Sequence, residues 1–248
     1  MSDTHAWVLG LHAVKSALRR QGDAEELLLD ANRRDGRIKE ILDLAEKAGI
    51  PWQQIPGRVL DERFRGGNHQ GVALCIRQRQ TQDEPYLKAQ LRRLEAPPFL
   101  LILDGVQDPH NLGACLRSAD GAGVQAVIAP RDRSVALTST VRKVASGAAE
   151  TVPFIQVTNL ARTLKWLKGE GVWLIGTAGE AAQSLYEVDL RGPLAIVMGG
   201  EGKGLRRLTR EQCDLLVKLP MAGSVESLNV SVACGVTLYE AVRQRGNV

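Results

Sequence analysis

The chain has 248 residues, enough to bury the core of one large domain or of two modest ones. Its composition, 44% hydrophobic and 24% charged, is that of an ordinary globular protein, and no apolar segment approaches the roughly 20 residues that a membrane-spanning helix needs. The net charge of +4 permits an RNA or DNA partner without requiring one.

The four cysteines are widely scattered with no Cys-x-x-Cys pair, and the four histidines share no ligand spacing. We therefore expect neither a disulfide framework nor a bound metal. The N-terminus has no apolar run preceded by basic residues, so we expect no signal peptide, no membrane association and a cytoplasmic location.

Short, mixed elements fill the first part of the chain. The spacing of apolar residues predicts helices over 11–18 and 37–48, and strands over 26–29 and 71–76. We therefore expect residues 1–77 to form a small α/β domain.

Residues 78–98 differ in character from the sequence on both sides. They begin with a polar run over 78–85 and end at the stiff break Ala96-Pro97-Pro98. This composition predicts an interdomain linker with room for a short helix.

A regular alternation begins at Phe99. Helical or loop segments separate continuous apolar runs, a pattern typical of a parallel sheet that is covered by helices on both faces. We therefore expect residues 99–248 to form one α/β domain whose ligand lies beyond the carboxyl ends of the strands. The predicted strands are 99–103, 124–129, 152–157, 172–176, 194–199 and 214–219.

Asn111 and Arg117 follow the first of these strands. Asn111 is suited to capping a helix that has an apolar face over 112–119. A helix-capping role for Asn111 and a solvent-exposed position for Arg117 would be enough to explain the two residues. However, helix starts after parallel strands face the ligand crevice, where an amide and a guanidinium could both contact RNA.

A glycine-rich loop follows the fifth predicted strand. A Walker A loop is excluded, because Val197 stands at the first glycine position and Gly204 follows Lys203. A dinucleotide fingerprint is excluded as well, since Leu205 replaces the last glycine. A looser match over 121–126 comes after a helix and before a strand, so we interpret it as a helix stop.

Polar residues stand in this loop and before the last predicted helix, over 230–241. Glu201 is either a solvent-facing turn residue or a functional one. In the functional case its carboxylate would accept hydrogen bonds from neighbouring loops or from a substrate hydroxyl. Ser227 or Asn229 would cap the helix, and capping alone would explain both. Neither a Ser-His-Asp triad nor a glycosidase-type pair of carboxylates is indicated.

Three motifs occur in order within the second domain: Asn111-x5-Arg117-Ser118-Ala119, Val197-Met198-Gly199-Gly200-Glu201-Gly202-x-Gly204, and Leu219-Pro220-Met221-x-Gly223-x3-Ser227-Leu228-Asn229-Val230-Ser231-Val232-Ala233. Taken together, they resemble the SPOUT methyltransferases of the SpoU/TrmH type, which methylate RNA ribose 2′-hydroxyls. The first domain resembles the small substrate-binding domain of that family through motifs at 10–14 and 69–73.

The resemblance implies a parallel-sheet domain with a C-terminal trefoil knot, preceded by a ribosomal-protein-like α/β domain. It also implies a homodimer that binds S-adenosylmethionine in the knot loops. Most family members have alanine where Gly200 stands, which would loosen the loop here. By this resemblance the cofactor would bind Thr177, Gly199, Gly200, Leu219, Met221, Ser227 and Leu228, and the catalytic residues would be Asn111, Arg117, Glu201, Ser227 and Asn229.

Arg117 would approach the ribose hydroxyl in such an enzyme. This hydroxyl is a poor nucleophile and must be deprotonated or strongly polarised as it attacks. Arginine gives up its proton with difficulty. Our hypothesis is therefore that Arg117 and a neighbouring RNA phosphate stabilise the developing alkoxide.

Within the family, this pairing of domains is most similar to bacterial enzymes that methylate a guanosine ribose in the peptidyl-transferase loop of 23S rRNA. The expected partner is thus 23S rRNA or a large-subunit precursor. Two alternatives remain open: a tRNA ribose 2′-O-methyltransferase, and a non-catalytic RNA-binding or ribosome-assembly protein that retains the fold. Binding of S-adenosylmethionine would separate the last alternative from the enzymes.

Overall fold

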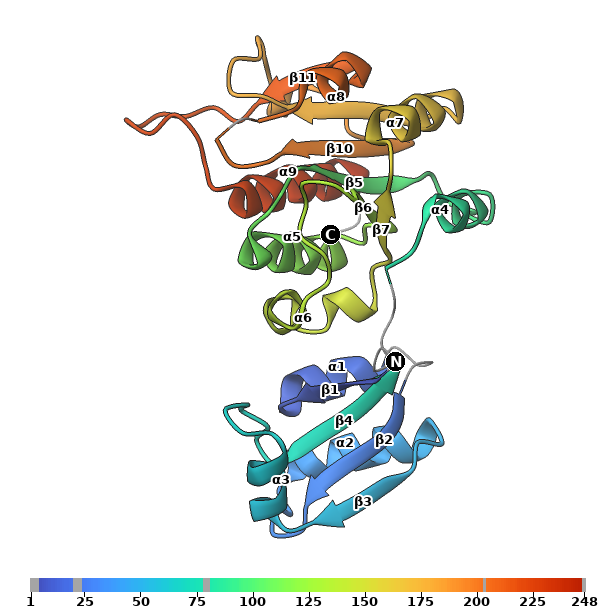
Figure 1. Ribbon diagram of the computed structural model, residues 1–248, viewed down its shortest axis with the longest axis vertical. Coiled ribbons are helices and arrows are strands. Elements are labelled where there is room, and N and C mark those ends of the chain that lie inside the picture. Colours follow the sequence, from blue (N-terminus) through green and yellow to red (C-terminus); the bar gives the residue numbers. More distant parts are fainter. Residues whose placement is uncertain (1–4, 20–23, 78–80, 203, 247–248) are drawn as a thin grey trace. The chain divides into compact units, whose positions relative to one another are not determined.

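The computed structural model describes residues 5–19, 24–77, 81–202 and 204–246, so Lys203 of the glycine loop lies outside the described residues. The chain divides into two compact units, Met1–Gln80 and Thr81–Val248 (Figure 1). Each unit has its own buried core.

The first unit is a four-stranded sheet in the order β1-β4-β2-β3. Strand β4 pairs antiparallel with β1 and β2, and β3 pairs parallel with β2. Helices α1 and α2 pack on one face, and α3 packs on the other through the buried Leu60. The elements are β1 (His5–Leu9), α1 (Leu11–Arg19), β2 (Ala24–Asp30), α2 (Gly36–Lys47), β3 (Trp52–Ile55), α3 (Gly57–Arg63) and β4 (Val72–Arg77).

Part of the segment expected to be a linker belongs to the second unit. Gln82 pairs with Ile155 at the edge of the second sheet, and helix α4 (Glu84–Leu91) buries Leu87 completely against that sheet. One fully buried residue on a short helix is a weak sequence signal, although its burial attaches the helix to the core. Residues 78–80 of the expected linker lie outside the described residues.

The second unit is a seven-stranded sheet in the order β7-β6-β5-β10-β8-β11-β9, and all neighbours are parallel. The expected parallel α/β sheet is therefore confirmed, and each of the six predicted runs overlaps a strand. The two-residue strand β9 was not predicted. The strands are β5 (Phe99–Asp104), β6 (Ala126–Pro130), β7 (Phe154–Val157), β8 (Trp173–Thr177), β9 (Gln183–Ser184), β10 (Leu194–Gly199) and β11 (Leu215–Lys218).

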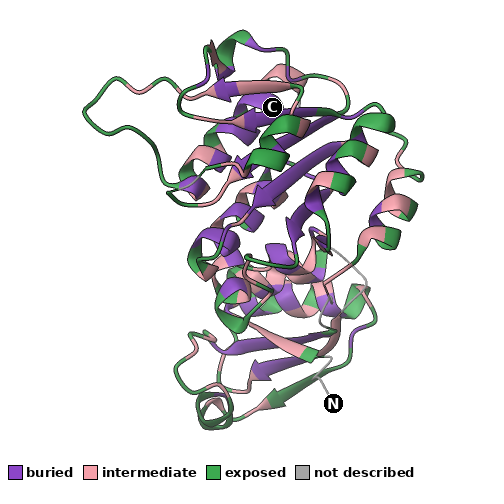
Figure 2. Ribbon diagram, turned by 45° about the horizontal axis from the view of Figure 1, so that its top comes forward, coloured by how far each residue is buried: buried purple, intermediate pink, exposed green. Residues whose placement is uncertain are grey.

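Helices cover both faces of this sheet, and their exposed sides point outward (Figure 2). In β5, Leu101 and Leu103 face one core while Leu100 and Ile102 face the other, as the two-residue period of a strand requires. Helices α5 (Pro109–Gly121), α6 (Ser139–Ala145) and α9 (Val230–Arg245) cover the first face; α7 (Leu160–Gly169) covers the second, with α8 (Arg207–Gln212) beside it. Short 3₁₀ turns η1 (Ala148–Glu150) and η2 (Leu185–Glu187) complete the unit.

The strand order changes direction beside β5, which has β6 on one side and β10 on the other. In open α/β sheets, ligands bind beyond the carboxyl ends of the strands at such a reversal. The loops after β5, β8, β10 and β11 all emerge at this edge. Among the helices in the described ranges, none combines the length and apolar character needed to cross a bilayer.

Candidate functional site

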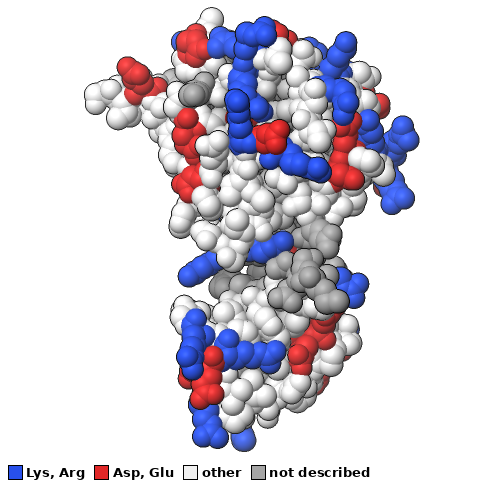
Figure 3. Space-filling model, viewed as in Figure 1, with Lys and Arg blue, Asp and Glu red and all other residues white. Residues whose placement is uncertain are grey.

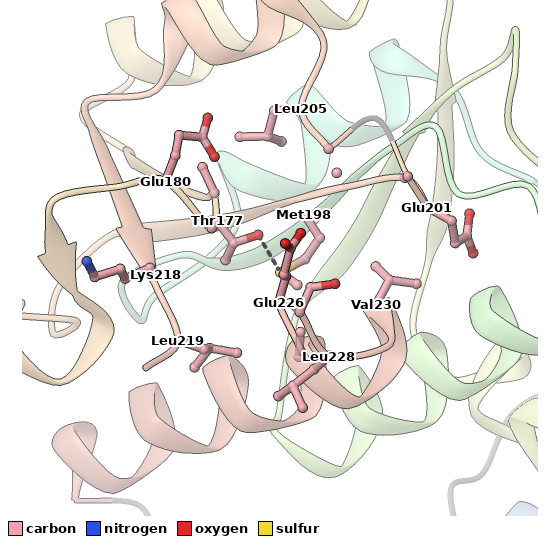
Figure 4. Close-up of a pocket in the computed structure, with 18 of the residues that line it drawn as sticks. Thr177, Glu180, Met198, Glu201, Leu205, Lys218, Leu219, Glu226, Leu228 and Val230 are labelled. Carbon is pink, nitrogen blue, oxygen red and sulfur yellow. Dashed lines mark hydrogen bonds between the residues drawn. The ribbon is translucent and has the colours of Figure 1, made fainter. Parts of the chain in front are cut away.

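A cavity of about 850 Å³ lies at the carboxyl ends of β8, β10 and β11. Figure 4 shows Thr177, Met198 and Glu226 pointing toward one another, with Glu180 and Lys218 to one side. The hydroxyl of Thr177 lies 3.5 Å from the sulfur of Met198. All residues expected to bind the cofactor line this cavity: Thr177, Gly199, Gly200, Leu219, Met221, Ser227 and Leu228.

The loop after β10 forms one wall of the cavity through backbone contacts. A Cβ on Gly199 would lie only 2.2 Å from the carbonyl carbon of Gly204, and a Cβ on Gly200 would lie 2.3 Å from the carbonyl oxygen of Gly105. Gly200 also donates its backbone N–H to the Asp104 carbonyl at 3.0 Å. The missing side chain at Gly200 lets the loop lie directly against the end of β5. That Gly200 loosens the loop stays a prediction.

An ion pair with a buried carboxylate fixes the far end of the same loop. The carboxylate of Asp104, fully buried at the end of β5, accepts a hydrogen bond from the backbone N–H of Arg206 at 2.9 Å and also binds the Arg206 guanidinium. A buried charge is tolerated only when it is paired and hydrogen-bonded in this way. Asp104 therefore holds both ends of the loop, through its main chain at Gly200 and its side chain at Arg206.

Asn111 joins three elements beside the cavity. Its side-chain N–H donates to Glu201 Oε1 at 2.6 Å, and its Oδ1 accepts from Asn229 Nδ2 at 3.1 Å. The Oδ1 of Asn229 accepts from both the backbone and the hydroxyl of Ser231, so Nδ2 is the atom left to face Asn111. This network connects α5, the glycine loop and α9.

Asn111 is not the helix cap that the sequence indicated. Helix α5 begins at Pro109, and its cap is Asp108, whose carboxylate accepts from the backbone N–H of His110 at 2.9 Å. Proline is favoured in the first turn of a helix, so the true start lies earlier than the motif suggests. Asn229 does cap α9, as one of the two expected alternatives, whereas Ser227 lies on the cavity wall.

Arg117 lies apart from the other expected catalytic residues. It is exposed on α5, six residues and therefore about 9 Å along the helix from Asn111. Its Nη1 lies 3.5 Å from the hydroxyl of Ser146, and it does not line the cavity. The structure thus brings Asn111, Glu201 and Asn229 into one network and leaves the Arg117 guanidinium facing solvent.

Sequence reasoning missed several charged residues of the cavity wall. Glu180 follows β8 and pairs with Arg210 of α8, and this hydrogen bond lowers the pKa of Glu180 below its ordinary value. Lys218 and Glu226 also line the cavity. Glu180 and Lys218 lie at or just beyond strand ends, the position that could have identified them.

The cysteines offer no reactive thiolate near the cavity. Burial raises the pKa of Cys213 to about 12, and the pKa of Cys234 rises well above its ordinary value through its hydrogen bond with Cys115 and through burial. Such thiols are poor nucleophiles at neutral pH. Across the described part of the chain, no three His, Cys, Asp or Glu side chains gather as metal ligands would.

Two family models match the chain. The SpoU rRNA Methylase family matches residues 98–239, and the family described as RNA 2′-O ribose methyltransferase substrate binding matches residues 7–82. A similar curated protein is the 23S rRNA (guanosine-2′-O-)-methyltransferase RlmB of Ralstonia nicotianae. It is 57% identical over 249 residues, which cover 97% of this chain and 96% of that protein.

Solved structures show the same fold. An RNA 2′-O ribose methyltransferase has a TM-score of 0.75 and 28% identity, covering 98% of this chain and 90% of that one. The SpoU methyltransferase AviRb of Streptomyces viridochromogenes, in complex with AdoMet, has a TM-score of 0.76 and 22% identity, covering 99% of this chain and 92% of that one. The second likeness concerns the fold alone.

Proposed function

Because the chain belongs to the SpoU rRNA methylase family, we propose that it transfers a methyl group from S-adenosylmethionine to the ribose 2′-hydroxyl of a guanosine in 23S rRNA. The observation that carries this proposal is the network of Asn111, Glu201 and Asn229 at the wall of a backbone-built cavity. The likeness to a 23S rRNA methyltransferase extends over nearly the whole chain, which favours rRNA over tRNA as the substrate. We place the target in the peptidyl-transferase loop, within free 23S rRNA or a large-subunit precursor.

The cavity residues fit S-adenosylmethionine. The cavity's volume of about 850 Å³ lies within the range of small-molecule sites. Met198, Leu219 and Leu228 provide apolar surface for a flat adenine ring. The carboxylates of Glu180 and Glu226 suit a ligand that carries an ammonium and a sulfonium. Bound S-adenosylmethionine supplies a methyl group activated by a positively charged sulfur.

The protein residues orient the reaction and stabilise charge. Asn111 and Asn229 hold Glu201 and the glycine loop against α5, so the ribose approaches a wall of fixed shape. Ser227 lies on the segment before α9 that lines the cavity. Arg117 and an RNA phosphate stabilise the alkoxide that develops as the 2′-hydroxyl attacks, and the exposed guanidinium is accessible to RNA.

The fold around this site supports a trefoil knot. The loop after β10 returns to β5 through Arg206, and the segment after β11 then returns to α5 through Asn229. Such returns of later segments past an earlier loop are what threading of the chain requires. Residues 99–248 form the catalytic domain in this proposal, and α4 of the connecting segment 78–98 packs against it.

The first 77 residues act as the RNA substrate-binding domain of this enzyme, a ribosomal-protein-like α/β domain. The match of residues 7–82 to a substrate-binding family supports this assignment. Arg34 and Arg37 at the start of α2 are exposed and are candidates for phosphate contacts. We place the enzyme in the cytoplasm, where bacterial rRNA is made and methylated.

The enzyme forms a homodimer through α9. Val232, Val236 and Tyr239 are 51%, 36% and 52% exposed, and their spacing places them on one face of the helix. A row of exposed apolar side chains of this kind is typical of a surface that another chain covers. The homodimer brings two copies of this face together.

The experiment that tests the reaction uses methyl-labelled S-adenosylmethionine with unmodified 23S rRNA and, separately, tRNA, followed by alkaline hydrolysis. A 2′-O-methyl group removes the internal nucleophile, so the labelled linkage resists cleavage. We expect label in one resistant dinucleotide of 23S rRNA that contains guanosine. Label only in tRNA would overturn the substrate, and failure to bind the cofactor in calorimetry would support the non-catalytic alternative.

A further inference from the structure

Two arginines beside the site keep their charges available. Arg131 and Arg133 lie in the turn that follows β6, and both residues are exposed. Over residues 5–19, 24–77, 81–202 and 204–246, neither guanidinium takes part in an ion pair or a hydrogen bond. We name this segment, residues 131–133, the arginine turn.

The arginine turn lies next to the catalytic edge. The carbonyl of Arg133 accepts from Gln107 Nε2 at 3.5 Å and lies 3.7 Å from where a Cβ on Gly105 would be. The carbonyl of Gly105 is in turn the group against which Gly200 packs. Only the loop after β5 therefore separates Arg133 from the loop that carries Glu201.

The backbone of Arg133 has an uncommon conformation. Its φ of 60° lies in the left-handed region, which residues other than glycine rarely adopt. Such conformations persist where the surroundings hold them, and they concentrate at functional sites. The contact of the Arg133 carbonyl with Gln107 is one of the interactions that hold the turn.

Most of the cations on α7 and α8 are paired with carboxylates of the protein itself. Over α7 and α8, Figure 3 shows Lys and Arg side chains interspersed with Asp and Glu. Four of these cations form ion pairs with carboxylates, whereas the guanidinium groups of the arginine turn do not. The pairs in that region include Arg162–Glu84, Lys168–Asp214, Arg207–Glu211 and Arg210–Glu180.

The chemistry of the substrate explains why free cations belong at this place. Every internal ribose of RNA lies between two phosphates, so a surface that receives a 2′-hydroxyl also faces phosphate groups. The carboxylates of Asp108 and Glu201 beside Asn111 would repel these phosphates unless cations lay nearby. Arginine is suited to this task because its fork of N–H groups binds phosphate in a bidentate way.

We propose that Arg131 and Arg133 bind the phosphates flanking the target nucleotide and thereby position its ribose at the Asn111–Glu201 edge. This proposal rests on the function proposed above and adds the surface that holds the substrate there. Phosphate contacts are the same for every base. The arginine turn therefore contributes affinity and position, while other contacts select the nucleotide.

The test compares full-length Arg131→Gln, Arg133→Gln and the double variant with the wild type, using labelled S-adenosylmethionine and an unmodified 23S rRNA fragment. The KM for RNA should rise about tenfold in the double variant. The plot of log binding constant against log salt concentration should become less steep by about 0.7–0.9 for each phosphate that the variant no longer neutralises. The affinity for S-adenosylmethionine and the position of the methylated nucleotide should not change.

Two further variants complete the experiment. Arg162→Gln removes an exposed arginine that is paired with Glu84 on α4, and it should behave as the wild type. Arg133→Lys keeps the positive charge and should keep the salt dependence. Both arginines would be excluded from phosphate binding if the double variant matched Arg162→Gln, or if its KM rose while its salt dependence stayed the same. A wild-type enzyme that methylates no RNA would instead overturn the proposed function.

Discussion

The two sides of the candidate site are built from different groups. On the side formed by the glycine loop, where we propose that the cofactor binds, main-chain atoms touch one another at Gly199 and Gly200. On the side that faces α5, the contacts are hydrogen bonds between the side chains of Asn111, Glu201 and Asn229. Packed main chain cannot rotate out of the way, whereas side chains give direction to donors and acceptors. Added atoms should therefore damage the first side, and removed atoms the second.

Gly199→Ala should cause the largest loss. The new Cβ would overlap the main chain of Gly204, which has no side-chain rotation to relieve the contact. We expect the affinity for S-adenosylmethionine, measured by calorimetry, to fall at least about 100-fold, or about 3 kcal/mol. The control is Gly179→Ala, in the same cavity wall, where nothing lies within 4 Å of the added atom. Equal affinities in the two variants would show that the glycine loop adapts.

Asp104→Asn should weaken the connection between the two sides. It removes the buried negative charge that pairs with the partly exposed Arg206, so the free energy of unfolding should fall by about 2 kcal/mol in urea titrations. The matched control is Arg207→Gln at the next residue, which breaks the exposed ion pair of Arg207 with Glu211. This change should lower the free energy of unfolding by less than about 1 kcal/mol. A loss no larger than that of the control would mean that the pair of Asp104 with Arg206 contributes little to stability.

Asn111→Ala should affect turnover rather than cofactor binding. It leaves Glu201 and Asn229 without their shared partner, so the edge that receives the ribose loses its fixed geometry. We expect kcat to fall about 100-fold, with the affinity for S-adenosylmethionine unchanged within about threefold. His110→Ala, an exposed neighbour on α5, is the control. A comparable loss of cofactor affinity in Asn111→Ala would remove the distinction between the two sides.

Glu240→Gln should have the smallest effect, since Glu240 lies on α9 away from both sides. The hydrogen bond from Arg243 lowers its pKa from 4.5 to about 2. The stability that the carboxylate contributes is therefore complete above about pH 4.5 and is lost as the pH falls through about 2. Thermal unfolding should separate wild type and variant at pH 6 and bring them together near pH 2. A difference that persists at low pH would assign the effect to packing.

The sequence predicted the central sheet well because its strands are continuous apolar runs. β1, β3 and α3 were not predicted. For β3 the reason is that it is a largely exposed edge strand with the polar residues Gln53 and Gln54. The two residues of β9 are too few to show a period. Helix α4 was expected only as a possible part of a linker, because a single buried leucine attaches it to the core.

The site was predictable where a motif carried it and not where distant residues meet. The glycine loop and the segment before α9 stand out in the sequence, and the structure brings them to one cavity. The pair of Asp104 with Arg206 joins positions 102 residues apart, and no local pattern marks it. In the sequence, Asn111 resembles a helix cap because the residues that follow it form an apolar helical face. Only the fold shows its partners to be Glu201 and Asn229.

The bond between Asn229 and Asn111 has a consequence for the order of events on the ribosome. Asn111 is made 118 residues before Asn229, together with the strand and helix that surround it. A nascent chain that ends before α9 can pair most of its strands, yet Asn111 then lacks its second partner and the cavity lacks a wall. Such a chain would be unable to methylate RNA, and activity would appear only after the last helix has docked.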